Sequence, residues 1–372
     1  MSLDLHRQAN TAAVLRALAE HGPASLGTLR GLTRLSRPTV ESILAELAAD
    51  QLVTSADPRP ADGRAGAGRP ARNYLINPDA RFVAGVDVGR HKVLVAIADL
   101  TGAVRTWQRA DVPAGTGGPE LLALVQQTII TATARVPIAI DQLQGIAVGV
   151  PGAVDGSGRI ARSVVVPQWS GHDIGRELSE WAGIPVTVGN DANLAVLAEQ
   201  RLGAARLRRD VIYILAGRRT RAAFMINGSV LTGRHGEAGE VGSVPELFFD
   251  TPEILLGDEN ADSEQVVGVF AAARSGDADS LERIHRYAGE LARTIRFLIT
   301  ILDPEVVVVG GGLAGAADQI LPAVIDDLGP AARGTPVVGS ELKDTGVALG
   351  AVHHVLLAAA ATDPMIAAVV SP

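Results

Sequence analysis

A run of helical patterns near the amino-terminal end constrains the fold of this 372-residue chain more than any other feature. Apolar side chains three and four residues apart predict a first helix over Thr11–Glu20. Ser25 and Ser36 stand where side-chain caps would begin a second and a third helix, and Pro38 falls in the first turn of the third. The order of the helices and the short turn predict a helix-turn-helix. The three apolar stripes are Val14, Leu15 and Leu18; Leu26, Leu29 and Leu32; and Val40, Ile43, Leu44 and Leu47.

The opposite face of the third helix carries polar side chains, and a basic loop follows it. In a helix-turn-helix this helix enters the DNA major groove, where its N-terminal residues meet base edges. A strand over Gln51–Ser55, a loop of glycine, proline and arginine, and a returning strand over Ala71–Asn77 predict a winged form. Arginines in a wing reach phosphates or the minor groove. The predicted DNA-binding residues are Ser36, Arg37, Pro38, Thr39 and Ser42 on the helix, and Arg64, Arg69 and Arg72 in the wing.

A small dimerisation module with a flexible linker is the alternative interpretation of residues 1–76. Charge bears on this choice, because residues 1–80 hold nine arginines and eight acidic residues, and the third helix carries Glu41 and Glu46. Affinity for DNA rises with the number of phosphates neutralised, so one copy should bind double-stranded DNA weakly. We therefore expect a homodimer or homotetramer. The rest of the chain is acidic, which confines the predicted DNA contact to this module.

Composition excludes several other classes. The chain has no cysteine, which removes disulfides, thiolate metal sites and thiol catalysis. The polar N-terminus does not resemble a signal peptide, and Thr362-Asp363-Pro364 interrupts the apolar tail Ala351–Val370. No apolar run is therefore expected to reach the roughly 18 residues of a membrane span. We expect a cytoplasmic protein that does not enter the membrane.

From Arg81 onward the pattern changes to strands and helices. The first half begins with a hairpin of Phe82–Val88 and Lys92–Asp99, followed by alternating strands and helices. A second half shows the same succession, beginning at the strand Asp210–Leu215. Two such halves predict an α/β fold of two lobes around a cleft. The expected divisions are a module over 1–76, a first lobe over 77–188 completed by 346–372, and a second lobe over 189–345.

Five short motifs follow one another through this body. They are Asp87-Val88-Gly89, Gly149-Val150-Pro151-Gly152, Asn190-Asp191-Ala192-Asn193, Gly239-Glu240-Val241-Gly242 and Gly310-Gly311-Gly312. In this order and spacing the sequence resembles the ROK family of repressors, open reading frames and sugar kinases. The resemblance covers the whole chain, because ROK repressors carry an N-terminal winged helix-turn-helix. It implies a two-lobed fold similar to actin and hexokinase, whose lobes close on a sugar.

The residues that a kinase needs are only partly present. Phosphoryl transfer requires a base near the sugar hydroxyl and backbone amides that cradle phosphates. Asp191 matches the family's catalytic aspartate, although Asn190-Asp191 is equally a helix N-cap. Arg90 and His91 replace glycine and threonine in the first phosphate loop, and arginines obstruct the glycine run of the second. We predict no catalytic residue, no cofactor and no enzymatic activity; the alternative is an ATP-dependent sugar kinase with an accessory N-terminal domain.

The sugar positions implied by the resemblance are mixed. Glu240 matches a sugar-binding glutamate, whereas the family's sugar-contacting asparagine maps to Val165 and its zinc-binding histidine to Ser243. The family's zinc-binding cysteines are absent, so no metal is expected. The predicted site for a sugar or sugar-phosphate effector is Asn190, Asp191, Glu240 and Ser243; the alternative is a ligand-free cleft kept as a dimerisation scaffold.

A second, anionic site is predicted from the arginines. If the two phosphate loops face each other, their basic side chains converge where phosphates would lie. Salt bridging to the acidic body is the alternative. The predicted anion site consists of Arg90, His91, Arg218 and Arg219, with Arg221 beside them. Taken together, the chain is predicted to be a transcriptional regulator, most simply a repressor acting on a palindromic or repeated operator.

Overall fold

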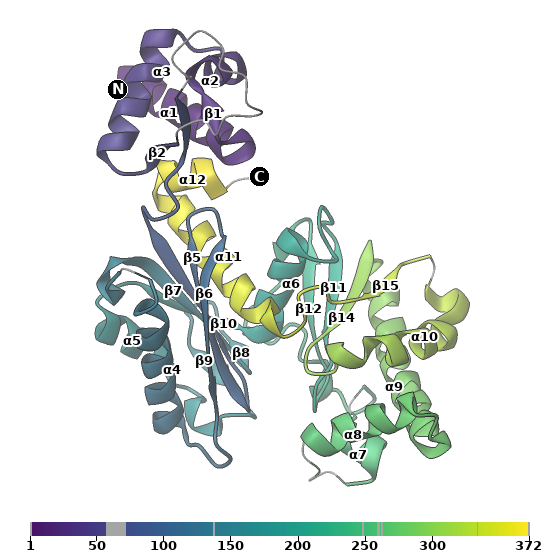
Figure 1. Cartoon of the computed structure of the whole chain (residues 1–372). Coiled ribbons are helices and arrows are strands. Elements are labelled where there is room, and N and C mark those ends of the chain that lie inside the picture. Colours follow the sequence, from purple (N-terminus) through teal and green to yellow (C-terminus); the bar gives the residue numbers. More distant parts are fainter. Residues whose placement is uncertain are drawn as a thin grey trace.

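The computed structural model describes residues 2–56, 72–136, 138–247, 249–258, 261, 263–332 and 334–370. These residues form a module of helices with a small sheet at the amino-terminal end, and two α/β lobes (Figure 1). The last helices of the chain return to the module, so both ends of the described chain lie in the same part of the molecule. The α/β class and the two-lobed body are confirmed.

The module is built as the sequence patterns indicate. The side chain of Ser25 accepts a hydrogen bond from the N–H of Thr28, and that of Ser36 accepts one from Thr39, so both predicted caps are confirmed. Val14, Leu15, Leu18, Leu29 and the stripe of the third helix pack into one core, with Leu26 partly buried against it. Leu32, the last member of the second stripe, is 45% exposed and lies outside this core. A three-stranded antiparallel sheet in the order β1-β3-β2 lies beside it. The elements are α1 (Ser2–His21), β1 (Ala24–Ser25), α2 (Leu26–Thr33), α3 (Arg37–Ala49), β2 (Val53–Ala56) and β3 (Asn73–Ile76).

The first helix is longer than predicted. It begins at Ser2 rather than Thr11, because the large apolar residues before Thr11, Leu3 and Leu5, are two residues apart and do not form a helical stripe in the sequence. Most of the predicted wing, with Arg64 and Arg69, falls in residues 57–71 and lies outside the described residues.

The first lobe is a mixed sheet in the order β10-β7-β4-β5-β6. Its central strand is buried along its whole length, as expected for a strand covered on both faces. β4, β7 and β10 run parallel to one another. β10 lies at one end of the strand order and, among the described strands, bonds to β7 alone. The elements are β4 (Phe82–Val88), β5 (Lys92–Asp99), β6 (Val104–Asp111), α4 (Gly118–Thr133), β7 (Leu143–Val150), the hairpin β8 (Ala153–Val154) and β9 (Ile160–Arg162), α5 (Ile174–Ala182) and β10 (Val186–Asn190).

The second lobe has the sheet order β13-β12-β11-β14-β15. The tight turn from β12 to β13 uses Asn227 and Gly228, both with positive φ, as this dipeptide favours. Long helices cover its core (Figure 1). The elements are α6 (Asp191–Leu202), β11 (Val211–Leu215), β12 (Arg221–Ile226), β13 (Ser229–Val230), α7 (Thr251–Leu256), α8 (Ser263–Arg274), α9 (Ala278–Leu302), β14 (Val306–Gly310), α10 (Ala317–Leu328) and β15 (Val337–Gly339).

One helix joins the lobes to each other and to the module. α11 (Gly346–Thr362) packs against α6, β4 and β7, and α12 (Pro364–Val370), which follows it, packs against α1. Close packing requires glycine at two positions. A Cβ on Gly350 would lie 1.8 Å from the carbonyl oxygen of Leu194, and one on Gly85 would lie 2.2 Å from that of Ala348.

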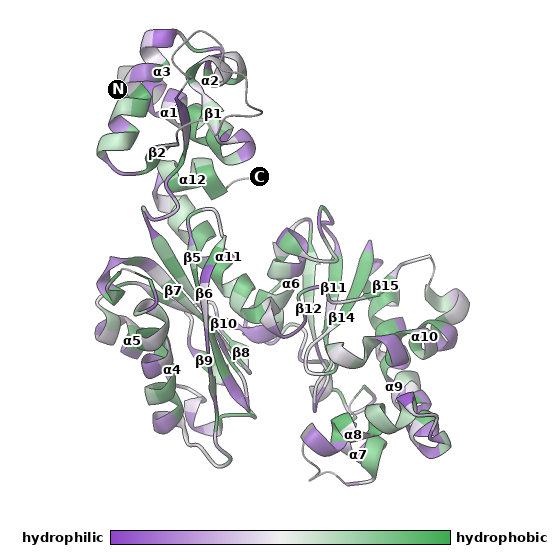
Figure 2. Ribbon diagram, viewed as in Figure 1, coloured by the Kyte–Doolittle hydropathy of each residue, from purple (hydrophilic) through white to green (hydrophobic). Residues whose placement is uncertain are grey.

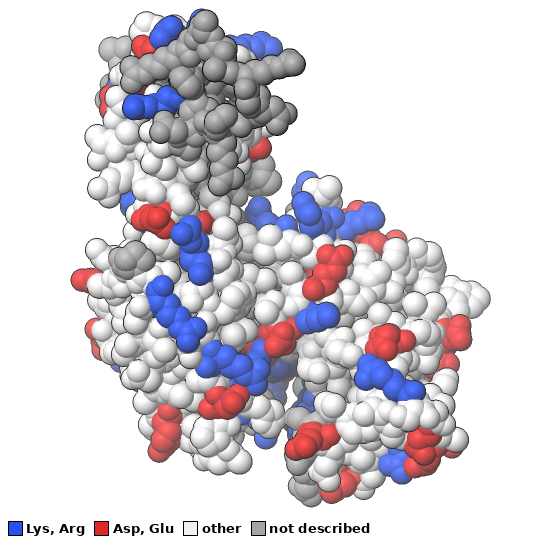
Figure 3. All heavy atoms as spheres, in the orientation of Figure 1, with Lys and Arg blue, Asp and Glu red and all other residues white. Residues whose placement is uncertain are grey.

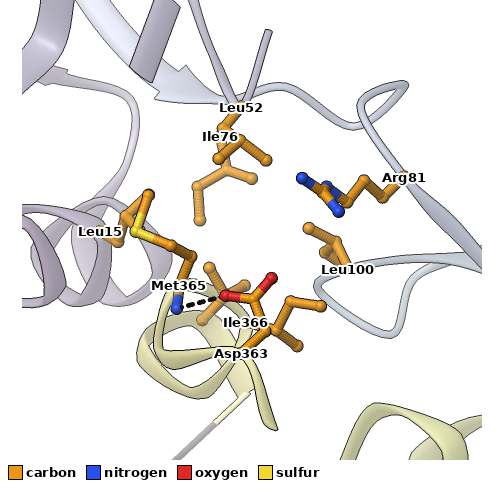
Figure 4. A pocket seen from close by; sticks show the side chains of 9 residues that line it. Leu15, Leu52, Ile76, Arg81, Leu100, Asp363, Met365 and Ile366 are labelled. Atoms are coloured by element: carbon orange, nitrogen blue, oxygen red, sulfur yellow. Dashed lines mark hydrogen bonds between the residues drawn. The ribbon is translucent and has the colours of Figure 1, made fainter. Parts of the chain in front are cut away.

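The joint between module and body is apolar. Figure 2 shows α12 as a hydrophobic segment set against the module. In Figure 4, Leu15, Leu52 and Ile76 of the module face Leu100 of the first lobe and Met365 and Ile366 of α12. These contacts couple the position of the module to the C-terminal helices.

The expectation about apolar length was wrong for one segment. Lys343–Thr362 has the length and mean hydropathy of a membrane-crossing helix. Its apolar side chains serve another purpose here, because α11 packs between the lobes and much of its surface is buried.

Candidate functional site

The exposed face of α3 carries the predicted DNA-binding residues of the module. Arg37, Pro38 and Ser42 are exposed, and Thr39 is partly exposed beside the cap Ser36. The guanidinium of Arg37 pairs with Glu41 one turn later, at 2.8 Å. α2 ends at Arg34 in the left-handed region, with φ 59°, which turns the chain sharply into α3.

Arg7, on the early part of α1, is a candidate that the sequence patterns missed. Its guanidinium donates to Ser42 Oγ and pairs with Glu46, so it lies against the exposed face of α3. The two glutamates of α3 are thus each paired with an arginine. This offsets the acidic charge that weakened the prediction of DNA binding. An open groove lies between the two helices, lined by His6, Arg7, Asn10, Pro38, Thr39, Ser42 and Ile43.

Basic side chains are unevenly spread over the described surface. Figure 3 shows several at the end of the module farthest from the lobes, with acidic side chains beside them. Of the predicted wing residues, Arg72 is described and exposed immediately before β3.

Asp191, the family's base position, is buried at the start of α6 and is held by an arginine. Its Oδ2 accepts a hydrogen bond from Arg221 Nη2 at 2.6 Å, and its Oδ1 accepts one from the N–H of Ala192 at 2.8 Å. Burial raises the pKa of Asp191, although the Arg221 guanidinium acts against this rise. Both carboxylate oxygens are therefore engaged within the protein.

Asn190 and the Glu240 turn complete the predicted effector site. The Asn190 side chain caps α6, accepting from the N–H of Asn193, and donates to the carbonyl of Gly152. Ser243 is exposed and donates to the backbone carbonyl of Glu240. Burial raises the pKa of Glu240, and the nearby Arg221 opposes that shift. The positive charge of Arg221 therefore acts on the carboxylates of both Asp191 and Glu240.

Two arginines of the second phosphate loop, Arg218 and Arg221, pair with acidic groups. Arg218 Nε is 3.5 Å from Asp250 Oδ2, and the backbone of Arg219 bridges that of Asp250. Arg90 and His91 are exposed at the turn between β4 and β5. Arg218 thus forms an ion pair of the kind that the alternative interpretation expects, and Arg221 points to Asp191.

Beside this cluster, Asp87 lies buried at the end of β4 near Lys92. The Lys92 ammonium is 3.4 Å from Asp87 Oδ2 and donates to the carbonyl of Asp344. Burial raises the pKa of Asp87 to about 6 despite Lys92. Among the residues described, no group of three or more histidine, cysteine or acidic side chains has the arrangement of a metal site.

The raised pKa of Asp87 predicts a pH dependence of stability. The folded chain holds this proton more tightly than the unfolded chain, so stability falls as pH rises from about 4 to 6, by up to about 3 kcal/mol. Asp87→Asn should remove that part of the fall in melting temperature between pH 4 and 7. Asp344→Asn, at the exposed carboxylate beside Lys92, removes only the smallest contribution to this rise in pKa and should therefore retain most of the fall. An unchanged profile in Asp87→Asn contradicts the assignment.

Similar proteins include a regulator that spans the chain and a kinase that matches less of it. The DNA-binding transcriptional dual regulator NagC of Escherichia coli K12 is 27% identical, over 94% of this chain and 93% of its own. The glucokinase of Thermotoga maritima is also 27% identical, but over 72% of this chain and 95% of its own. A crystal structure of a ROK family transcriptional regulator, a homolog of the E. coli MLC protein, superposes with a TM-score of 0.70 at 21% identity. It covers 98% of this chain and 99% of its own.

The shared fold and the match of residues 83–251 and 257–355 to the ROK family agree with the five motifs that the sequence carries. The chain belongs to the ROK family.

Proposed function

We propose that this chain is a DNA-binding transcriptional repressor whose kinase-like body no longer catalyses phosphoryl transfer. The extent of similarity carries the proposal: NagC matches the module and the body together, whereas the glucokinase matches a share of the chain that is about the length of the body. A module that accompanies the body in a regulator is expected to serve regulation.

The geometry of the module supports a winged helix-turn-helix over residues 1–76. α2 and α3 are joined by a three-residue turn, and β2 and β3, which follow α3, form a small sheet with β1 in the place of a wing. We place α3 in the major groove, with Ser36, Arg37, Pro38, Thr39 and Ser42 toward the bases. Arg64, Arg69 and Arg72 would contact the DNA backbone or minor groove from the wing.

We propose that residues 77–372 form two lobes, as the sequence indicates. The first lobe covers 77–188 and is completed by 346–372, and the second lobe covers 189–345. A homodimer or homotetramer in the cytoplasm would bind two half-sites about one helical turn apart, or a multiple of that spacing.

The Arg221–Asp191 ion pair supports the loss of kinase activity. A general base needs a free lone pair within reach of the substrate hydroxyl. Here each oxygen of Asp191 already accepts one hydrogen bond, and one of the donors is a guanidinium from the obstructed phosphate loop, which makes the carboxylate less basic. A cation fixed in this position also occupies space beside the base.

The same ion pair bears on the effector of the cleft, for which we propose a sugar phosphate in preference to a neutral sugar. Asn190 and Asp191 already use their polar atoms within the protein. An anionic ligand offers Arg221 a replacement for Asp191, and this exchange would free the carboxylate for a ligand hydroxyl.

Electrophoretic shift of genomic fragments by the full-length protein, together with an ATP-turnover assay over a panel of sugars, tests the function. We expect sequence-selective retardation of DNA and no turnover. Turnover abolished by Asp191→Asn would establish the kinase alternative. Absence of any DNA shift would favour a module that binds protein.

Arg7 provides a sharper test of the interface. Arg7→Ala should weaken all DNA evenly and reduce the slope of log affinity against log salt by about 1, because one phosphate contact is lost. Arg16 is the matched control: it is exposed on α1 and, nine residues later, lies about half a turn round the helix. If Arg7→Ala leaves the salt dependence unchanged, Arg7 only braces α3 through Glu46.

A further inference from the structure

The helix α9 of the second lobe carries one stripe of exposed side chains along its outward side. The opposite side of the helix, from Ile284 to Ile299, packs into the core of the lobe. α9 lies on the side of the second lobe away from the first lobe and the module (Figure 1). The members of the stripe are three or four residues apart, so they share one face of the helix over roughly 30 Å. They are Glu282, Arg286, Glu290, Arg293, Phe297 and Ile301.

The C-terminal end of this stripe is apolar and uncovered. Phe297 is 50% exposed and Ile301 is 60% exposed, although the other side of the same helix is closely packed. The two side chains are one turn apart and therefore adjoin. Single exposed apolar residues are common on protein surfaces, whereas adjoining large ones mark a surface that a partner covers. An aromatic side chain is also a type that is enriched where proteins meet.

The rest of the stripe carries charges of both signs. Glu282 lies 3.8 Å from Arg286, and Glu290 pairs with Arg293, so acidic and basic members alternate along the helix. DNA, or any other partner of one charge, would meet attractive and repulsive groups in equal number on this face. Alternating charges instead fit a partner that presents the same alternation in the opposite direction.

A second copy of α9 that runs antiparallel presents that order. With a two-fold axis between residues 291 and 292, Glu290 of each copy faces Arg293 of the other. Arg286 of each copy then faces Phe297 of the other. The first contact pairs opposite charges, and the second places a guanidinium beside an aromatic ring. Because each contact occurs twice, the face is self-complementary, as a two-fold interface requires.

We propose that the outward face of α9 is a dimer interface, on which α9 of a second copy of this chain packs antiparallel along the stripe. Its purpose rests on the proposed repressor function, since two half-sites are bound by two modules held in a fixed relation. The interface would cover Phe297 and Ile301. It would join two second lobes and leave both modules free, because α9 lies away from the module (Figure 1).

Sedimentation velocity of the full-length protein over a concentration series tests the interface. The wild type is expected to form a dimer or a larger even-numbered assembly. Phe297→Glu should raise the dissociation constant of this contact about 100-fold or more, because an aromatic anchor is lost and a carboxylate enters the covered stripe. Val267→Glu is the matched control. Val267 is 58% exposed on α8, outside the stripe, and its replacement should leave association unchanged.

Reversal of charge tests the antiparallel alignment. Glu290→Arg and Arg293→Glu should each raise the dissociation constant about 10-fold, because each sets like charges opposite one another at two symmetric places. The double variant Glu290→Arg/Arg293→Glu reverses both charges and keeps them complementary across the axis. It should bring the dissociation constant back to within about 3-fold of the wild type.

A monomeric wild type overturns the proposal and would leave this face to a different protein. Association as tight as that of the wild type in both Phe297→Glu and Glu290→Arg also overturns it. If Phe297→Glu does not fold, unchanged association in Glu290→Arg is sufficient. A double variant as weak as either single variant overturns the antiparallel alignment.

Retardation of genomic DNA fragments is measured in parallel for each protein. A monomeric wild type that still retards DNA selectively leaves the repressor function standing without this interface. A wild type that dimerises through α9 and retards no DNA leaves the interface standing without the repressor function.

Discussion

Replacing Arg37 by alanine is expected to weaken binding to a selected operator about 10- to 100-fold while changing affinity for unrelated DNA little. A side chain that makes paired hydrogen bonds to a base edge contributes about 1–3 kcal/mol of discrimination. Arg37 stands in the first turn of α3, where base contacts concentrate in this motif. Fluorescence anisotropy with an operator duplex and a scrambled duplex measures both affinities.

Arg16→Ala is the control, since this arginine is exposed on the module but belongs to α1. It should leave the ratio of the two affinities unchanged. Glu41→Gln releases Arg37 from its ion pair and should retain selectivity. An Arg37→Ala protein that keeps its full preference for the operator contradicts the placement of α3 against the bases.

Gly350→Ala is expected to destabilise the body by about 3 kcal/mol or more and to loosen the link between lobes and module. The new Cβ would lie 1.8 Å from the carbonyl oxygen and 2.4 Å from the carbonyl carbon of Leu194, and both are backbone atoms. α11 must therefore move away from α6, along the same helix that leads to α12 and the module. Thermal melting measures the loss of stability, and limited proteolysis near residue 363 measures the loosened joint.

Gly268→Ala is the matched control, because Gly268 is exposed within α8 and a Cβ there would meet nothing within 4 Å. That change should stabilise the helix by about 0.5–1 kcal/mol. If Gly350→Ala melts at the wild-type temperature, the close packing of α11 on α6 is not as described.

The sequence predicts the framework well wherever local physics decides. The caps Ser25 and Ser36 and the buried strand Phe82–Val88 lie where periodicity and capping residues place them. Each depends on a stripe or a side chain within a few residues, which a single sequence displays. The first turns of α1 show no such stripe, so their helix went undetected.

Contacts between segments that lie far apart in the sequence cannot be predicted from periodicity or capping residues. The pairing of Arg221 with Asp191 joins residues 30 apart, and that of Arg7 with Ser42 joins residues 35 apart. The sequence offered an anion site or salt bridging to the acidic body for these arginines, and it did not indicate Asp191 as the partner of Arg221. The role of α11 was missed for a related reason, because an apolar helix in sequence does not reveal which elements it separates.

The structure therefore treats the predicted DNA-binding residues and the predicted effector and anion sites differently. The residues of α3 form one exposed face, as expected. In the predicted effector site Asp191 pairs with Arg221, and the Asn190 side chain bonds to Gly152 and to the start of α6. Arg218 pairs with Asp250 of its own lobe. Arginine positions in a loop indicate charge, whereas the partner of each guanidinium depends on tertiary packing.

Selection of genomic fragments by the full-length protein, followed by an affinity measurement on the recovered sequence with wild type and Arg37→Ala, tests the central claim most directly. The account predicts a recovered sequence with repeated or palindromic half-sites, bound selectively by the wild type and without that selectivity by Arg37→Ala. Recovery of no common sequence, or equal selectivity in both proteins, would contradict it.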